Sequence, residues 1–185
     1  KVDQVLSRLM EIILAFPSIL FALAITPVLE SVLTRAGLPD GNGVRIPVMI
    51  FVISTFGWPY IARIVRGQVI SLREREFIEA ARALGASRWH LVFREILPHL
   101  WAPILVTVAL NIPTFITTEA ALTFLGAGVI EPTSDWGAML LASVPFYRVD
   151  PMYTFIPGFA LFILVLAFNL LGDSVRDALD PKSSR

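Results

Sequence analysis

The sequence predicts an all-α integral membrane protein with four transmembrane helices, and two observations lead to this fold class. Of the 185 residues, 56% are hydrophobic and only 16% are charged, whereas about 25% of the residues in a soluble domain are charged. The apolar residues also gather in four long uncharged stretches instead of spreading along the chain. Since a helix needs roughly 20 apolar residues to cross a bilayer, each stretch is long enough, or nearly so, to form one span.

The predicted spans are residues 12–29, 46–62, 100–118 and 151–172, which are uncharged over 18, 17, 19 and 22 positions. After the third stretch the apolar run resumes beyond Glu119 and continues to Ile130. Residues 136–147 are also uncharged, but 12 residues are too few to cross. We therefore expect a short interfacial or re-entrant helix there, which Ser134 or Asp135 could cap.

Prolines lie within all four spans, at positions 17, 27, 59, 113 and 157. Each proline removes a backbone donor and bends its helix. Two interpretations stay open: the bends serve helices that move or line a path, or they are ordinary kinks of membrane helices.

Basic residues are distributed unequally between the two sides that the spans define. Residues 1–8, 63–94 and 176–185 together hold twelve Lys and Arg, whereas the opposite side holds only Arg35, Arg45 and Arg148. The side richer in Lys and Arg is usually cytoplasmic. We therefore expect both ends of this piece, and the charged connector between the second and third spans, to be cytoplasmic.

The connector carries the pattern of two short helices. Apolar residues share one face of the first helix, and Gly85 can end it in a positive-φ conformation. Ser87 can then cap the second helix. The predicted apolar stripes are Phe77, Ala80, Ala81 and Leu84 in the first helix, and Trp89, Val92, Phe93, Ile96 and Leu100 in the second.

Small residues on the first helix, namely Ala80, Ala81 and Gly85, allow another surface to approach its backbone closely. Residues 76–100 contain three Glu, three Arg and no Lys, whereas a helix lying in headgroups favours Lys and bulky apolar residues. This pattern favours docking into a protein groove. A solvated amphipathic connector is the alternative.

The string Glu79-Ala80-Ala81, followed by Gly85 and by Leu97-Pro98, resembles the EAA signature of ABC importer permeases. It departs from that signature at Glu95, where an apolar residue is usual. The flanking strings VLSRLMEIILAFPSIL, GWPYIARIVRGQVISLRERE, EAALTFLGAGVIEPTSDWGAML and LAFNLLGDSVRDALDP are similar to the C-type subunit of the dipeptide, oligopeptide and nickel branch. The resemblance covers essentially the whole chain.

The resemblance implies a type I ABC importer transmembrane fold, with residues 1–185 as part of one permease domain and residues 67–99 as its coupling loop. It implies a second permease, usually different in sequence, two cytoplasmic ATPases and an extracytoplasmic solute-binding protein, in a bacterial or archaeal inner membrane. The coupling residues would be Glu79, Ala80, Ala81, Gly85, Ala86 and Ser87. Members usually have six spans and this chain starts at Lys1, so we expect two N-terminal spans to be missing from this piece.

Glu119 is the one carboxylate inside a long apolar run, and an intramembrane charge is costly unless it faces a cavity or a partner. It can face the translocation path, bind a neighbouring helix, or sit near the outer surface. Asn111, beside Pro113, is a second path candidate, although a structural kink explains it equally well.

No cofactor, nucleic acid or metal is expected. The chain has no Cys, and its two His, His90 and His99, lack the spacing of a zinc site. It has no Gly-Lys-Ser/Thr phosphate loop, so we expect no ATPase activity of its own and assign hydrolysis to partner subunits.

Two function classes are therefore weighed. The first is the permease subunit of an ATP-driven importer of peptides or similar small solutes, which include dipeptides, oligopeptides, nickel chelates and glutathione. The alternative is an ion-coupled secondary transporter, for which more intramembrane acids than Glu119 and an internal repeat are expected. An intramembrane enzyme would need a nucleophile with a base, or a metal set, within the spans, and the sequence contains neither.

Overall fold

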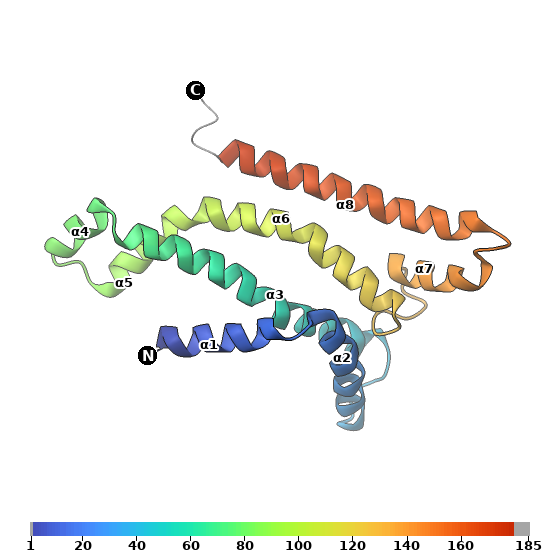
Figure 1. Cartoon of the computed structure of the whole chain (residues 1–185). Coiled ribbons are helices and arrows are strands. Elements are labelled where there is room, and N and C mark those ends of the chain that lie inside the picture. The colour runs from blue at the N-terminus through green and yellow to red at the C-terminus, as the bar shows by residue number, and fades with distance from the viewer. Residues whose placement is uncertain (1, 180–185) are drawn as a thin grey trace. The chain divides into compact units, whose positions relative to one another are not determined.

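The computed structural model describes residues 2–179, and this range is helical without β-strands (Figure 1). The elements in order are α1 (Val2–Ala15), α2 (Ser18–Arg35), α3 (Asn42–Arg73), α4 (Glu76–Ala83), α5 (Arg88–His90), the π-helix η1 (Leu91–Ile96), α6 (Leu97–Phe124), α7 (Trp136–Ser143), the 3-10 helix η2 (Val144–Phe146) and α8 (Pro151–Leu179). Four helical segments of this range are long and apolar enough to cross a membrane: Ser18–Arg35, Asn42–Arg73, Arg88–Phe124 and Pro151–Leu179. The predicted number and order of spans are confirmed.

The boundaries of the first and third spans differ from the prediction. Residues 12–15 belong to α1, and the span begins only at Ser18, because Pro17 lacks an N–H and disfavours the helical conformation at Phe16. At the other boundary, α6 extends past the predicted end at residue 118 to Phe124, and Gly126 follows it with φ of 87°. Proline thus breaks the helix at position 17, whereas Pro27, Pro59 and Pro157 lie inside helices.

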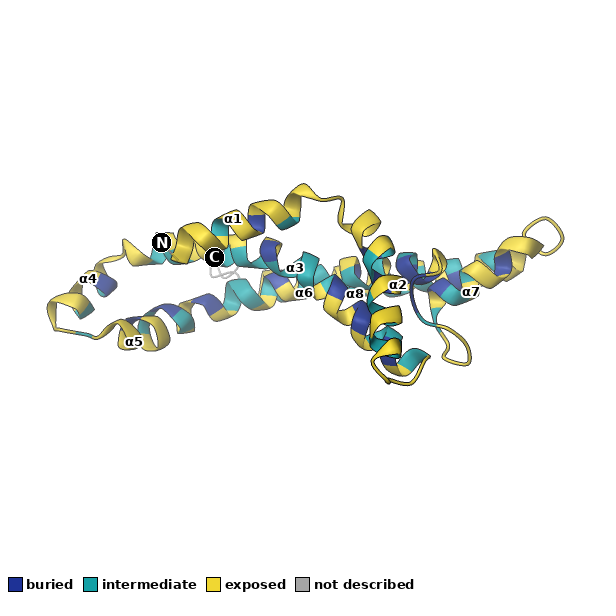
Figure 2. Ribbon diagram, turned by 90° about the horizontal axis from the view of Figure 1, so that it is seen from below, coloured by how far each residue is buried: buried dark blue, intermediate teal, exposed yellow. Residues whose placement is uncertain are grey.

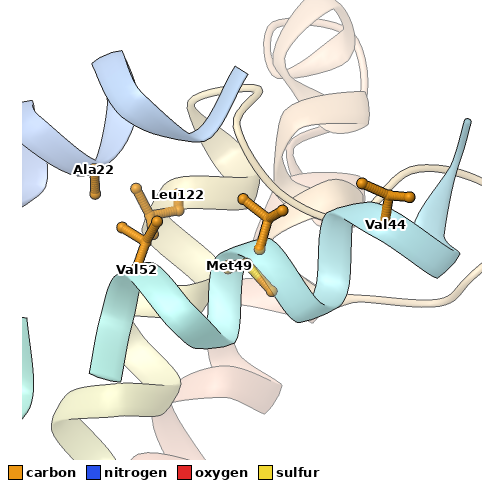
Figure 3. Close-up of a cluster of buried hydrophobic side chains, with 6 residues drawn as sticks. Ala22, Val44, Met49, Val52 and Leu122 are labelled. Atoms are coloured by element: carbon orange, nitrogen blue, oxygen red, sulfur yellow. The ribbon is translucent and has the colours of Figure 1, made fainter. Parts of the chain in front are cut away.

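The chain forms two compact units: residues 1–59 with 112–168, and residues 60–111 with 169–185. The core of the first unit lies where α2, α3 and α6 meet. Figure 3 shows the side chains of Ala22, Val52 and Leu122 converging there from these three helices. Gly57 of α3 adds a close contact, because a Cβ at this position would lie 2.9 Å from the ring of Phe115.

Polar side chains at the start of α3 hold the loop that follows α6. The Asn42 amide binds both backbone groups of Ile130: its Oδ1 accepts from the N–H at 2.9 Å, and its Nδ2 donates to the carbonyl oxygen. The same Nδ2 donates to Thr133 Oγ1 at 2.8 Å. One turn later, Arg45 lies 3.4 Å from the Glu30 carboxylate and donates to the Gly128 carbonyl at 3.3 Å. These residues form a polar clasp between α2, α3 and the loop 125–135.

Replacing Asn42 with alanine is expected to loosen this loop. The Ile130 N–H and carbonyl would lose their partner, and an ordinary protein hydrogen bond contributes about 0.5–1.5 kcal/mol to stability. Amide hydrogen exchange of residues 126–133 should therefore accelerate. Thr55→Ala is the matched control, because the Thr55 hydroxyl bonds only to Phe51 of its own helix. Unchanged exchange in Asn42→Ala would contradict a stabilising role for the clasp.

Two glycines allow the short helix α7 and the loop before it to pack closely against the end of α6. A Cβ at Gly137 would lie 2.2 Å from the Ala120 carbonyl oxygen, and a Cβ at Gly128 would lie 2.0 Å from Thr123 Oγ1. The predicted cap is confirmed, since Asp135 Oδ1 accepts from the Ala138 N–H at 2.8 Å. The prediction of a short, non-spanning helix here is also confirmed.

The second unit contains the connector and the helix ends around it. Its core consists of Ile78, Leu91, Ile96 and Leu100, with Val65, Val69 and Leu72 packed against them. Farther along α6, Gly172 of α8 fits against α6, because a Cβ there would lie 2.9 Å from Leu110 Cδ2. The base of the connector therefore packs on α3 and on the start of the following span.

Candidate functional site

The corner between α4 and α5 is fixed by backbone hydrogen bonds. The Ala86 N–H donates to the Ala81 carbonyl at 3.0 Å, and the Gly85 N–H donates to the Arg82 carbonyl at 2.9 Å. Together with φ of 84° at Gly85, these bonds make a Schellman motif. Ser87 Oγ then accepts from the His90 N–H at 3.2 Å. The predicted Gly-Ala-Ser corner is therefore confirmed as a defined turn.

The face by which α4 packs differs from the prediction. Ile78, which was not in the predicted stripe, is 0% exposed and packs against Leu91, Ile96 and Leu100, whereas Leu84 is 89% exposed. Phe77 and Ala81 of the predicted stripe do pack on this core. The packed face is therefore displaced from the predicted one toward Ile78, because two adjacent faces of an eight-residue helix satisfy the helical period almost equally. The alanine ridge therefore lies partly outward, with Ala80 exposed and Ala81 half-buried.

The predicted stripe of the second helix is also partly wrong. Trp89 is 74% exposed and stacks on the exposed Phe93 with ring centroids 5.2 Å apart. Ile96 and Leu100 of the predicted stripe are buried as expected, and Leu91, which was not predicted, is buried with them. The cause is the π-helix η1, because its wider turn places residues five apart on one face and shifts the register.

Side chains link α4 to the first turn of α6. The Phe77 ring stacks on the His99 ring, with centroids 4.8 Å apart. The Nδ1 atom of His99 lies 2.6 Å from the Glu95 carbonyl oxygen, and His90 Nε2 lies 3.4 Å from the Glu95 carboxylate. Glu95, the departure from the signature pattern, thus sits between the two His. Among residues 2–179, no cluster of three or more His, Cys, Asp and Glu could hold a metal ion.

The six predicted coupling residues lie together on α4 and its corner. Figure 2 shows that α4 and α5 present mostly exposed residues. Glu79, Ala80, Gly85 and Ser87 are exposed, whereas Ala81 and Ala86 are half-buried against the connector core. The helix α4 therefore exposes small residues on one face, while its other face packs on the connector core.

The two predicted path residues are bonded within their own helix. Glu119 is half-buried and accepts a 3.1 Å hydrogen bond from Thr123 Oγ1, and its carboxyl group also meets that of Asp135. Asn111 Nδ2 donates to the Thr107 carbonyl at 2.7 Å. Sequence reasoning had missed the Asp135 contact, since the two residues are joined only through the loop that follows α6.

The described residues form an all-helical membrane domain with four candidate spans, and the family whose model matches the chain has the type I ABC importer transmembrane fold. Residues 1–185 match the family model described as binding-protein-dependent transport system inner membrane component. The chain belongs to this family.

Curated relatives agree with this assignment. The chain is 42% identical, over 98% of its length, to a dipeptide transport system permease protein of Alkalihalophilus pseudofirmus. It is 41% identical, over 97% of its length, to a glutathione transport system permease protein of Shigella flexneri, and 38% identical, again over 97%, to that of Pectobacterium atrosepticum. The chain spans about half of each relative, at 55%, 55% and 56% of their lengths.

Proposed function

We propose that this chain is part of a permease subunit of an ATP-driven importer of peptides or similar small solutes. Family membership and the transport of dipeptides and of glutathione, for which the relatives are named, support this substrate class. The proposal includes a second permease that completes the path, two ATPases and an extracytoplasmic solute-binding protein. The excess of Lys and Arg supports a cytoplasmic position for the connector, within an inner-membrane protein.

The observation that carries the coupling role is the construction of the connector. Its outer surface is made of small, exposed residues around Ala80, which allows close approach of another protein. Its inner surface is anchored by the fully buried Ile78. One face of such a helix is exposed and the other is packed. A partner that binds the exposed face and moves therefore also moves the helix ends on which the packed face lies. We therefore assign residues 67–99 as the coupling loop, with α4 seated in a cleft of the ATPase.

The translocation path is assigned to Glu119 and Asn111. Glu119 supports this role because it is a half-buried acid at the end of a long apolar helix, where a charge is tolerated next to a cavity or partner. Asn111 carries an amide within the same helix. These two side chains would bind an amine or an amide group of a peptide substrate.

Replacing Ala80 with tryptophan tests the docking role. Overpacking a fitted contact costs about 1–3 kcal/mol, so we expect binding of the ATPases to weaken by about tenfold or more, while membrane insertion persists. The measurement is ATPase retention and solute-stimulated ATP hydrolysis in the purified importer. Ser71→Trp is the control, because Ser71 is small and exposed but lies on α3.

Equal coupling in Ala80→Trp and Ser71→Trp would contradict docking through α4. A second result would overturn the importer assignment itself. Solute uptake by the permease pair in vesicles without ATPases, driven by a proton gradient, would identify an ion-coupled carrier instead.

A further inference from the structure

Three arginines surround one cavity of the second unit. It has a volume of about 550 Å³, and Arg73 of α3, Arg82 of α4 and Arg88 of α5 line it. Its apolar lining includes Val69, Leu91 and Ile96. All three arginines are exposed. The cavity therefore combines a positively charged rim with an apolar wall, and we call it the arginine-rimmed cavity.

The three arginines of this rim form no salt bridge within the described part of the chain. No ion pair joins any of the three guanidinium groups to a carboxylate of residues 2–179. The nearest acids, Glu74 and Glu79, line a separate cavity of about 340 Å³ that shares Arg73 and Arg82. Arg88 lines only the arginine-rimmed cavity. Its exposed guanidinium is therefore free to bind an anionic group.

The position of the cavity along α3 decides between a lipid and a protein occupant. The uncharged part of this span ends at Ala62, and Arg73 lies eleven residues farther along the same helix. At about 1.5 Å per residue, this places Arg73 roughly 15 Å beyond the apolar stretch when the helix stands near the membrane normal. The headgroup layer is only about 5–8 Å thick on each side, so the rim lies beyond lipid phosphates.

We propose that the arginine-rimmed cavity receives a carboxylate-bearing segment of the partner ATPase, with the acid on the rim and an apolar neighbour against the wall. The inference rests on the proposed function and extends it, because it assigns a second contact beside the small-residue surface of α4. Arginine suits this role since its planar group binds carboxylates with two parallel hydrogen bonds. The contact would favour approach of an acidic partner and fix its register.

Arg88→Glu is the sharpest test. A glutamate in the first turn of a helix is favourable to that helix, so loss of binding would not come from unfolding of α5. In the purified importer we expect ATPase retention to fall by about tenfold or more. Arg94→Glu is the control, because Arg94 is exposed on η1 but does not line the cavity. Retention in this variant should stay near that of the wild type.

Salt provides the second readout. Raising salt from about 0.05 M to about 0.5 M screens exposed charges, so ATPase retention by the wild type should decrease, whereas retention by Arg88→Glu should change much less. Equal retention in Arg88→Glu and Arg94→Glu would overturn the proposal. So would a defect in Arg88→Glu that appears only in nanodiscs containing anionic phospholipid, since that result would assign the rim to lipid.

A cross-link separates this inference from the proposed function. Ala80→Cys should cross-link to the ATPase if α4 docks there. If the cross-link forms but Arg88→Glu and Arg94→Glu behave alike, only the arginine contact is wrong. If Ala80→Cys never reaches the ATPase in an otherwise wild-type importer, the docking role itself is wrong.

Discussion

Replacing Gly137 with alanine is expected to destabilise the protein more than any other single-methyl change discussed here. The added Cβ would lie 2.2 Å from the Ala120 carbonyl oxygen and 2.9 Å from Thr123 Cβ. The first of these atoms belongs to the backbone of α6, which cannot rotate away as a flexible side chain can. The helix α7 must therefore move off α6, at a cost of about 3 kcal/mol or more.

Thermal unfolding of the purified protein in detergent, followed by tryptophan fluorescence, measures this effect. Gly158→Ala is the matched control, since its Cβ would meet only Leu140 Cδ2 at an ordinary 3.6 Å. Alanine in place of a helical glycine is otherwise favourable by about 0.5–1 kcal/mol. Gly158→Ala should therefore keep or raise the Tm while Gly137→Ala lowers it, and similar Tm values would disprove the tight docking of α7.

Replacing Ile78 with alanine is expected to loosen the connector while leaving the spans inserted. The Ile78 side chain is 0% exposed and lies at the centre of the connector core. Truncating a buried isoleucine to alanine costs about 2–5 kcal/mol. In the proposed importer this loss would separate α4 from the helix ends beneath it, so solute-stimulated ATP hydrolysis should fall together with the order of the connector.

Hydrogen exchange of the amides in residues 76–96 measures the loosening directly. Leu84→Ala removes a similar side chain from the same segment, but Leu84 is 89% exposed, and exposed substitutions usually stay within about 0.5 kcal/mol. Protection should therefore fall in Ile78→Ala and persist in Leu84→Ala. Equal protection in both variants would show that Ile78 does not hold the connector in place.

Features that depend on neighbouring residues could be predicted from the sequence. The four spans follow from apolar length, and the Gly85 turn and the Ser87 and Asp135 caps follow from local backbone chemistry. The start of the first span could not be predicted in this way. Residues 12–15 are as apolar as the residues after Pro17, and a proline can either kink a membrane helix or end it.

Local sequence patterns could not predict contacts between residues that are far apart in the sequence. Asn42 and Ile130 are 88 positions apart, and a single asparagine in a turn gives no sign of its partner. The burial of Ile78 in place of Leu84 follows from the position of α3 and η1, not from the spacing within α4. The π-helix has no reliable sequence pattern, so the register shift at Trp89 and Phe93 could not be foreseen.

The stacking of Phe77 on His99 has a consequence for following the connector in solution. The imidazole is tied through Nδ1 to the Glu95 carbonyl oxygen, so it stays with the α6 backbone while the phenyl ring travels with α4. A small rotation of α4 therefore changes the overlap of the two rings without distorting the backbone. Such a rotation would change the ring-current contribution of Phe77 to the NMR chemical shifts of the His99 ring protons. These shifts therefore report the angle between α4 and α6 without an added label.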